Sequence, residues 1–300
     1  MSRMAHAAHI PNEFSRCSPS LLLPPNLWFA QGVSCLPCQN SEVQPLRTIR
    51  VTRYVTPLRE GGSLPAIVEA DDDGLYVLKF RGAGQGARAL IAELVSGEIA
   101  RAAGLPVPEL VFAELEEELA RTEPDPEIHA LIRDSAGLNL ALDYLPGSVT
   151  FDPAVHKVPA ELASQIVWLD AYLTNVDRTA RNTNMLLWHR RLWLIDHGAT
   201  LYFHHTPGWE SAPTRAREPF ALLQNHVLLP LASQLEEIDR AMTAALTEDV
   251  LGAIVDRVPD TWLEERTTSS AGELRAAYRR YLTERVASPR AFVEEGVRAR

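Results

Sequence analysis

The sequence predicts an α+β protein in two parts, a strand-rich part followed by a mostly helical one. Three observations predict this class: alternation of apolar and polar residues over 46–80, one strong helix-forming stretch over 87–103, and repeated helical patterns in the second half. A chain of 300 residues that is 46% hydrophobic can bury two such parts with a cleft between them. The turn Pro146-Gly147 marks the boundary, which gives 46–145 and 146–300 as two lobes.

The first part contains five candidate strands, at 46–57, 63–70, 75–80, 108–114 and 138–144. Short turns such as the acidic Asp71–Gly74 are typical of antiparallel neighbours. The helix over 87–103 follows the glycine-rich segment 82–86 and ends at Gly104, just before Pro106. We therefore expect an antiparallel sheet with one helix.

The second part is dominated by helical patterns. Its candidate helices lie at 159–173, 218–229, 234–246, 248–258 and 271–297, the last broken near Ser288-Pro289. A short strand pair, 185–188 with 192–195, is joined by the turn His189-Arg190-Arg191. We expect a mostly helical lobe that holds one hairpin.

The first 45 residues differ from the rest of the chain. They mix Pro, Ser, Asn and His without a sustained period, which predicts poor order. All three cysteines, Cys17, Cys35 and Cys38, lie in this segment, so the remaining chain has no thiol for a disulfide framework.

Charge and hydropathy narrow the choice of partners. A net charge of -10 argues against binding along a nucleic-acid backbone, which needs concentrated Lys and Arg. The apolar run Leu21–Leu23 stops at Pro24, far short of the roughly 20 residues of a membrane span. We expect no nucleic acid and no membrane as partners, and a cytoplasmic location.

The most informative motif runs from Asp177 to Asn182 and is followed, 14 positions after the Asn, by Asp196 in Asp-His-Gly. A carboxylate, an amide five residues later and a second carboxylate across a hairpin are typical of the catalytic and metal loops of ATP-dependent phosphotransferases. Asp177 is then the candidate base, while Asn182 and Asp196 offer the oxygen ligands that Mg²⁺ prefers. A D-x-x-x-x-N pattern alone occurs by chance in Asx turns and helix caps. Asn184 is a rival metal ligand, although its place in the apolar alternation favours a structural hydrogen bond.

Upstream, Lys79 lies on a half-buried strand, where a charge needs an anionic partner such as a nucleotide phosphate. The carboxylate that orients it is expected from the following helix, where Glu93 and Glu98 compete. Glu93 is favoured because it shares a helix face with small residues that let the helix approach the sheet.

Two further segments are candidates for binding the nucleotide. The loop Gly61-Gly62-Ser63 can present backbone N–H groups to phosphates, although as a motif it is weak, and the glycine-rich 82–86 is a second candidate. His197 stands where a Phe is usual in the D-F-G motif, and packing or hydrogen bonding explains a single imidazole more often than metal ligation.

These residues together resemble the HipA-like kinases, in a compact branch without HipA's extra N-terminal subdomain. The segments that carry the resemblance are Arg59–Ala66, Tyr76–Phe80, Ala92–Glu109, Asn175–Asn182 and Leu194–Gly198. The resemblance implies a bilobal protein-kinase-like fold, ATP and Mg²⁺ as cofactors, and phosphorylation of Ser or Thr. It assigns Lys79 to the phosphates, Asp177 to the base role, Asn182 and Asp196 to metal, and Asp143-Tyr144-Leu145 to the adenine hinge.

Three functions follow from this interpretation. The first is a Ser/Thr protein kinase that acts on a protein hydroxyl. The second is a kinase for a small metabolite or an inositide-type acceptor, because the same phosphate machinery serves such substrates. The third is a nucleotide-binding regulator without catalysis, which the intact set of catalytic residues disfavours.

Overall fold

The computed structural model describes residues 45–58, 64–211, 213–265, 267 and 269–300. Nearly all of the N-terminal segment 1–45, with its three cysteines, lies outside these ranges. The loop Gly61-Gly62-Ser63 lies outside them as well. The expectations for both segments stay predictions.

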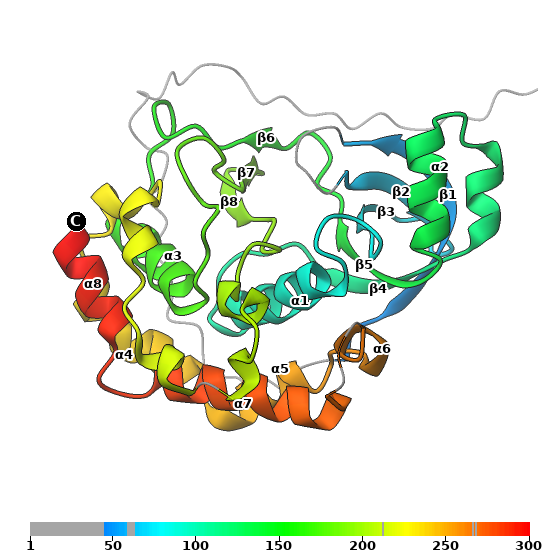
Figure 1. Cartoon of the computed structure of the whole chain (residues 1–300). Coiled ribbons are helices and arrows are strands. Elements are labelled where there is room, and N and C mark those ends of the chain that lie inside the picture. The colour runs from blue at the N-terminus through cyan, green and yellow to red at the C-terminus, as the bar shows by residue number, and fades with distance from the viewer. Residues whose placement is uncertain (1–44, 59–63, 212, 266, 268) are drawn as a thin grey trace, which may run out of the picture. The chain divides into compact units, whose positions relative to one another are not determined.

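The first part of the chain forms a five-stranded sheet (Figure 1), built from β1 (Thr48–Pro57), β2 (Ala66–Ala70), β3 (Leu75–Lys79), β4 (Leu110–Leu115) and β5 (Gly137–Asp143). The strands are hydrogen-bonded in the order β1-β2-β3-β5-β4, and β1 also pairs with β4, which closes the sheet into a barrel. Four of the strand pairs are antiparallel, as predicted, but β1 and β4 are parallel. A parallel pair needs a long crossover, and the chain between β1 and β4 provides one through two strands and a helix.

That helix, α1 (Ala87–Ala102), matches the sequence prediction closely. Nearly every residue from Leu90 to Ala100 is buried, as in a helix surrounded by protein on all sides. Gly97 allows α1 to approach β4, because a Cβ at Gly97 would lie 2.9 Å from Cδ1 of Leu110. The same approach brings Glu93, one turn earlier, toward the sheet.

A second helix in the first part, α2 (Pro126–Asp134), contradicts the prediction of a single helix there. Asp125 caps it by accepting a hydrogen bond from the N–H of Glu127 at 3.0 Å. The helix buries Ile128 and Ile132 in the core of the barrel, after the short 3-10 segment η1 (Glu117–Thr122). With only 9 residues and a proline at its start, it offers too short an apolar period to be distinguished from a loop in the sequence.

The second part is mostly helical within the described ranges (Figure 1). Its helices are α3 (Ala160–Tyr172), α4 (Leu235–Ala245), α5 (Glu248–Val255), α6 (Asp260–Leu263), α7 (Ala271–Val286) and α8 (Ala291–Ala299). Its three strands form a small antiparallel sheet of β6 (Val149–Thr150), β7 (Met185–Trp188) and β8 (Arg191–Leu194). Short 3-10 segments fill the connections, namely η2 (Tyr202–His205), η3 (Trp209–Ser211), η4 (Pro213–Arg217), η5 (Ala221–Asn225) and η6 (Leu229–Leu231).

The predicted helix over 218–229 is wrong, because tertiary contacts override its local propensity. His226 has an extended backbone and forms a β-bridge with Thr179. The N–H of Val227 donates to the carbonyl oxygen of Arg178 at 3.1 Å instead of to an intrahelical acceptor. The segment therefore divides into η5 and η6. The β-bridge and the hydrogen bond from Val227 hold it against the chain around Arg178.

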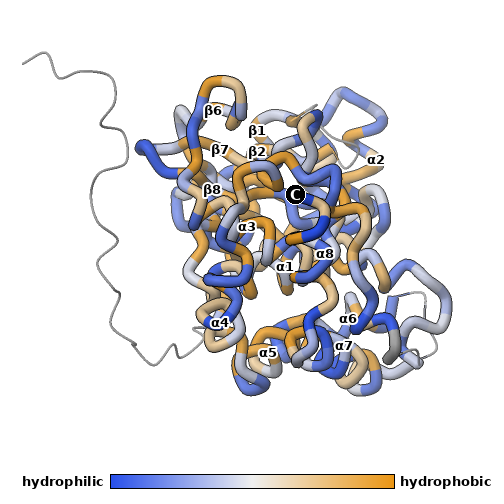
Figure 2. Tube along the Cα trace, turned by 90° about the vertical axis from the view of Figure 1, so that its left-hand side faces the viewer, coloured by the Kyte–Doolittle hydropathy of each residue, from blue (hydrophilic) through white to orange (hydrophobic). Residues whose placement is uncertain are grey.

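The core shows which elements belong together. Helix α1 and the buried side chains of α3 to α8 belong to one hydrophobic cluster, which also includes Leu110 of β4 and Leu140 of β5. The opposite faces of the same strands, with Val111 and Ala141, belong to a second cluster inside the barrel. Figure 2 shows the contrast along the helices, with α5 largely hydrophobic and α7 interrupted by hydrophilic stretches. No helix in the described ranges has both the length and the apolarity to cross a bilayer.

Candidate functional site

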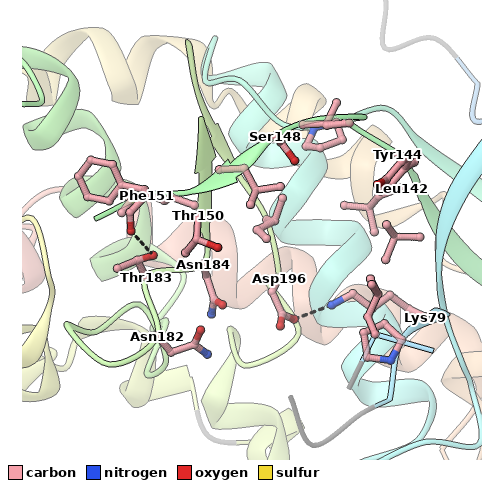
Figure 3. A pocket seen from close by; sticks show the side chains of 18 of the residues that line it. Lys79, Leu142, Tyr144, Ser148, Thr150, Phe151, Asn182, Thr183, Asn184 and Asp196 are labelled. Carbon is pink, nitrogen blue, oxygen red and sulfur yellow. Dashed lines mark hydrogen bonds and ion pairs between the residues drawn. The ribbon is translucent and has the colours of Figure 1, made fainter. Parts of the chain in front are cut away.

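A cavity of about 1150 Å³ is lined by residues of both parts of the chain (Figure 3). One portion is apolar and includes side chains from β3, β5 and β7: Val77, Leu142 and Met185. The other portion is polar and includes Lys79, Asn182, Asn184 and Asp196. The sequence-predicted residues of the two motif regions therefore meet at one hollow.

Lys79 lies at the end of β3 and contacts two carboxylates. Its Nζ donates to Oδ1 of Asp196 at 2.6 Å and lies 3.5 Å from Oε2 of Glu93. Burial acts to lower the pKa of Lys79, but the charges of Glu93 and Asp196 outweigh it and hold that pKa above its usual value. Lys79 is thus a fixed cation that joins α1 to the segment after β8.

Of the two competing glutamates, Glu93 is the one beside Lys79. Glu93 is 1% exposed in the middle of α1. Glu98 instead forms ion pairs with Arg101, at 3.2 Å, and with Arg257. Burial raises the pKa of Glu93, but the Lys79 charge and then His197 outweigh it and lower this pKa to about 2.

The loop after α3 brings three polar side chains together. The side-chain amides of Asn182 and Asn184 donate to Oδ2 of Asp177 at 2.8 and 3.1 Å. Both asparagines line the cavity, and Asp177 lies half-buried one hydrogen bond behind them. Because each amide nitrogen is turned toward Asp177, the two amide oxygens stay available to another ligand.

The β7–β8 hairpin explains how Asp196 reaches these asparagines. Met185 pairs with Leu194, so Asn184 and Ile195 are opposite each other at the open end of the hairpin, and Asp196 follows directly. The N–H of Ile195 donates to the carbonyl oxygen of Asn184 at 3.0 Å, which extends the pairing by one step. Asn184 and Asp196 both have left-handed backbones, with φ of 47° and 55°, a conformation that Asn and Asp tolerate better than most residues.

A buried polar network under the loop was missed by the sequence analysis. Asp170 of α3 accepts hydrogen bonds from Arg178 at 2.5 Å, His226 at 2.8 Å and Asn175 at 2.9 Å. Arg178 also donates to the carbonyl oxygen of Asn184. Burial raises the pKa of Asp170, but the charge of Arg178 and the hydrogen bond from His226 outweigh it and hold that pKa below its usual range.

This network connects the loop to distant parts of the chain. The Asn175 side chain accepts from the N–H of Asp177 at 3.0 Å, so the network reaches the candidate base directly. His226 accepts from the N–H of Leu228 at Nδ1, which places its ring proton on Nε2, toward Asp170. The sequence held one usable signal, a lone carboxylate inside the apolar stretch around Trp168 and Tyr172, because a buried charge requires partners. His226 carried no such signal.

The predicted adenine hinge lies on the cavity wall. Asp143, Tyr144 and Leu145 all line the cavity where β5 ends. The N–H of Tyr144 donates to Leu75 at 3.0 Å, so this edge is held against β3. Burial, followed by the charge of Glu109, raises the pKa of Asp143.

Comparison with known proteins identifies the class. A family model described as HipA-like kinase matches residues 51–289, which is more than half of the chain. The chain belongs to the HipA-like kinase family, and the resemblance predicted from its motifs is confirmed.

Solved kinase structures are also similar to this chain. The Helicobacter pylori proinflammatory kinase CtkA has a TM-score of 0.47 and 12% identity, covering 85% of this chain and 98% of that one. A Golgi casein kinase has a TM-score of 0.36 and 10% identity over 81% of this chain and 73% of that one. A Golgi casein kinase with Mn/ADP bound has a TM-score of 0.36 and 11% identity over 85% and 75%. The comparison with curated proteins gave no match.

Proposed function

We propose that the protein is an ATP- and Mg²⁺-dependent kinase of bilobal architecture that transfers the γ-phosphoryl group to a Ser or Thr hydroxyl of a protein. Residues 46–145 would form one lobe and residues 146–300 the other. The single observation that carries this proposal is the cavity at which Lys79, Asn182 and Asp196 meet, with Asp177 directly behind.

The cavity suits a nucleotide in both its size and its division into two portions. Its apolar portion, which includes Val77, Leu142 and Met185, suits the apolar faces of an adenine ring. Leu145 and its neighbours would present the hinge backbone to the edge of the base. At the other end Lys79 would hold the phosphates, since its raised pKa keeps the amine charged.

The donor set at the polar end suits a hard divalent cation. The side chains of Asn182, Asn184 and Asp196 offer two amide oxygens and a carboxylate, and such oxygens are the ligands that Mg²⁺ takes. We assign Asp196 and Asn182 to the metal, and Asn184 to the orientation of Asp177. When bound, the metal would supply charge that stabilises the transferring phosphoryl group.

The remaining chemistry belongs to Asp177. Two amides donate to its Oδ2, which fixes the carboxylate plane and leaves Oδ1 for an acceptor hydroxyl. Asp177 would orient this hydroxyl and take its proton. The buried network around Asp170 holds the loop in this geometry.

The test is transfer of label from ATP in the presence of Mg²⁺ to the protein itself or to proteins of a cell extract. We expect labelled phosphoserine or phosphothreonine with the wild type, and no label with Asp177→Ala or Asp196→Ala. Asn182→Ala should raise the Mg²⁺ concentration needed for half-maximal activity more than Asn184→Ala does. Label that survives Asp177→Ala contradicts the base role, and label that appears only on small hydroxyl compounds replaces the protein acceptor by a metabolite.

A further inference from the structure

Two buried polar side chains near the cavity, Glu93 and His197, face each other without a hydrogen bond to either side chain in the described part of the chain. Neither carboxylate oxygen of Glu93 and neither ring nitrogen of His197 has a hydrogen-bond partner among the described residues. Both side chains are almost fully buried, with exposures of 1% and 0%. Oε1 of Glu93 lies 3.6 Å from Nδ1 of His197, slightly beyond hydrogen-bonding distance.

The backbone of His197 is fixed against the helix that carries Glu93. Its carbonyl oxygen accepts hydrogen bonds from the side chain and the N–H of Thr200, at 2.7 and 3.0 Å. The Thr200 hydroxyl in turn bonds to Ser96, which lies one turn beyond Glu93 on α1, at 2.6 Å. The imidazole is therefore held beside Glu93 by contacts that do not involve the imidazole itself.

Glu93 needs a second donor because Lys79 is shared. The amine of Lys79 is 2.6 Å from Asp196 but 3.5 Å from Glu93, so its closest bond is to the other carboxylate. A buried carboxylate without a donor is costly, and a neutral imidazole with a proton on Nδ1 would supply one.

We propose that His197 is a positioning residue, which donates from Nδ1 to Oε1 of Glu93 and keeps this carboxylate directed at Lys79. The inference rests on the proposed kinase function. His197 follows Asp196 directly, so one dipeptide supplies one carboxylate partner of Lys79 and lies beside the other. Nothing in this contact requires His197 to touch the nucleotide or to change its charge.

Substitutions at His197 test the donor. His197→Phe keeps an aromatic ring and removes both nitrogens, and we expect kcat/KM for ATP to fall about 10- to 100-fold, as for a misplaced catalytic group. His197→Asn places an amide N–H near the position of Nδ1 and should recover most of the loss. A fall with Phe without recovery with Asn, or no fall with Phe, overturns the proposal.

A matched control is available in His204, a second fully buried histidine on the same segment. Its ring bonds to the hydroxyl of Tyr278 at 2.9 Å and to His205 at 3.1 Å, away from Glu93. His204→Phe should lower the melting temperature and leave kcat/KM for ATP close to the wild-type value. A fall in kcat/KM equal to that of His197→Phe would assign the effect to the loss of a buried imidazole, and so overturn the proposal.

A double-mutant cycle reports on the contact without nucleotide. The melting temperatures of Glu93→Met, which has no acceptor oxygen, of His197→Phe and of the double variant are measured in the absence of ATP and Mg²⁺. We expect the double variant to lose clearly less than the sum of the single losses, because both substitutions break the same contact. Additive losses overturn the inference. A wild type that transfers no phosphoryl group contradicts the kinase function alone, since the cycle still reports on the contact.

Discussion

Two buried carboxylates, Asp170 of α3 and Glu93 of α1, differ in how they are bonded. Asp170 accepts three hydrogen bonds of 2.9 Å or less, from an arginine, a histidine and an asparagine. Glu93 faces a lysine at 3.5 Å and a histidine at 3.6 Å, and neither of its oxygens accepts a hydrogen bond from any residue that the structure describes. The hydrogen bonds of Asp170, which supports the Asp177 loop, are thus supplied by the protein itself. Glu93, beside Lys79, still has oxygens that can accept hydrogen bonds, as expected close to a site that holds a ligand.

The largest effect is expected from breaking the hydrogen-bond network around Asp170. Asp170→Ala leaves Arg178 charged and buried without its carboxylate, so the free energy of unfolding should fall by about 3–5 kcal/mol. Urea unfolding followed by circular dichroism measures it. Asp170→Asn is the control, because it keeps the shape and one acceptor oxygen and should cost less. A loss below about 1 kcal/mol for the Ala variant would show that the network does not stabilise the loop.

Substitution of Glu93 should affect the rate of phosphoryl transfer more than the free energy of unfolding. In Glu93→Gln the amine of Lys79 keeps Asp196 as its partner, so the loss of unfolding free energy should be smaller than for Asp170→Ala. The rate should fall by about 100-fold, because the amine is then held in the wrong place. Steady-state kinetics with varied ATP, alongside urea unfolding of the same preparation, separate the two effects. A large stability loss with little change in rate contradicts the comparison.

Substitution of His226 tests one of the three hydrogen bonds to Asp170. His226→Ala removes one of the three donors to Asp170, and the free energy of unfolding should fall by about 1–3 kcal/mol. We also expect kcat to fall, because Asp170 in turn holds Asn175, whose side chain accepts from the N–H of Asp177. His226→Gln can keep one donor and should retain more of both properties. Equal losses for the Ala and Gln variants would show that the donor itself contributes nothing.

The pH dependence of stability distinguishes Glu93 from a solvent-exposed glutamate. Its pKa falls from 4.5 to about 2 on folding, so its contribution is fully present above pH 4.5 and is lost as pH falls toward 2. The unfolding free energy of Glu93→Gln should therefore depend less steeply on pH over this window than that of the wild type. Parallel curves for the two proteins would show that Glu93 is not ionised with a depressed pKa.

The smallest effect is expected at Glu98, the glutamate five residues further along α1. Glu98→Gln removes the negative charge that pairs with Arg101 and Arg257 but keeps an amide oxygen that can accept from Arg257, so the unfolding free energy should fall by about 1 kcal/mol. The kinetic constants for ATP should stay unchanged, since Glu98 does not contact Lys79. A rate loss equal to that of Glu93→Gln would contradict the assignment of Glu93.

Much of the strand and helix pattern could be predicted because those elements carry their own periodicity. The helix at α1 and the hairpin at β7–β8 have bounds within a residue or two of those expected. Helix α2 and the segment 218–229 could not be predicted. The first is too short for its apolar period to be recognised, and the second is determined by hydrogen bonds to Arg178.

The site shows the same division. Lys79, Asp196 and the Asp177 loop could be inferred because phosphoryl transfer restricts which residue types appear at which spacing. Asp170 and His226 could not be paired from the sequence, since they lie 56 positions apart and only the fold brings them together. The choice between Glu93 and Glu98 depended on which face of the helix approaches the sheet. The position of Gly97 against Leu110 identifies this face.

The bridge between Thr179 and His226 has a consequence for dissecting the gene product. A fragment that stops at Gly198 contains every diagnostic motif, yet it lacks the imidazole that closes the Asp170 network and the strand-like contact that holds the loop from behind. Such a fragment would carry these motifs but only part of the family match, which continues to residue 289. The unit to express therefore extends through α8, because the buried side chains of α3 to α8 share one hydrophobic cluster with α1.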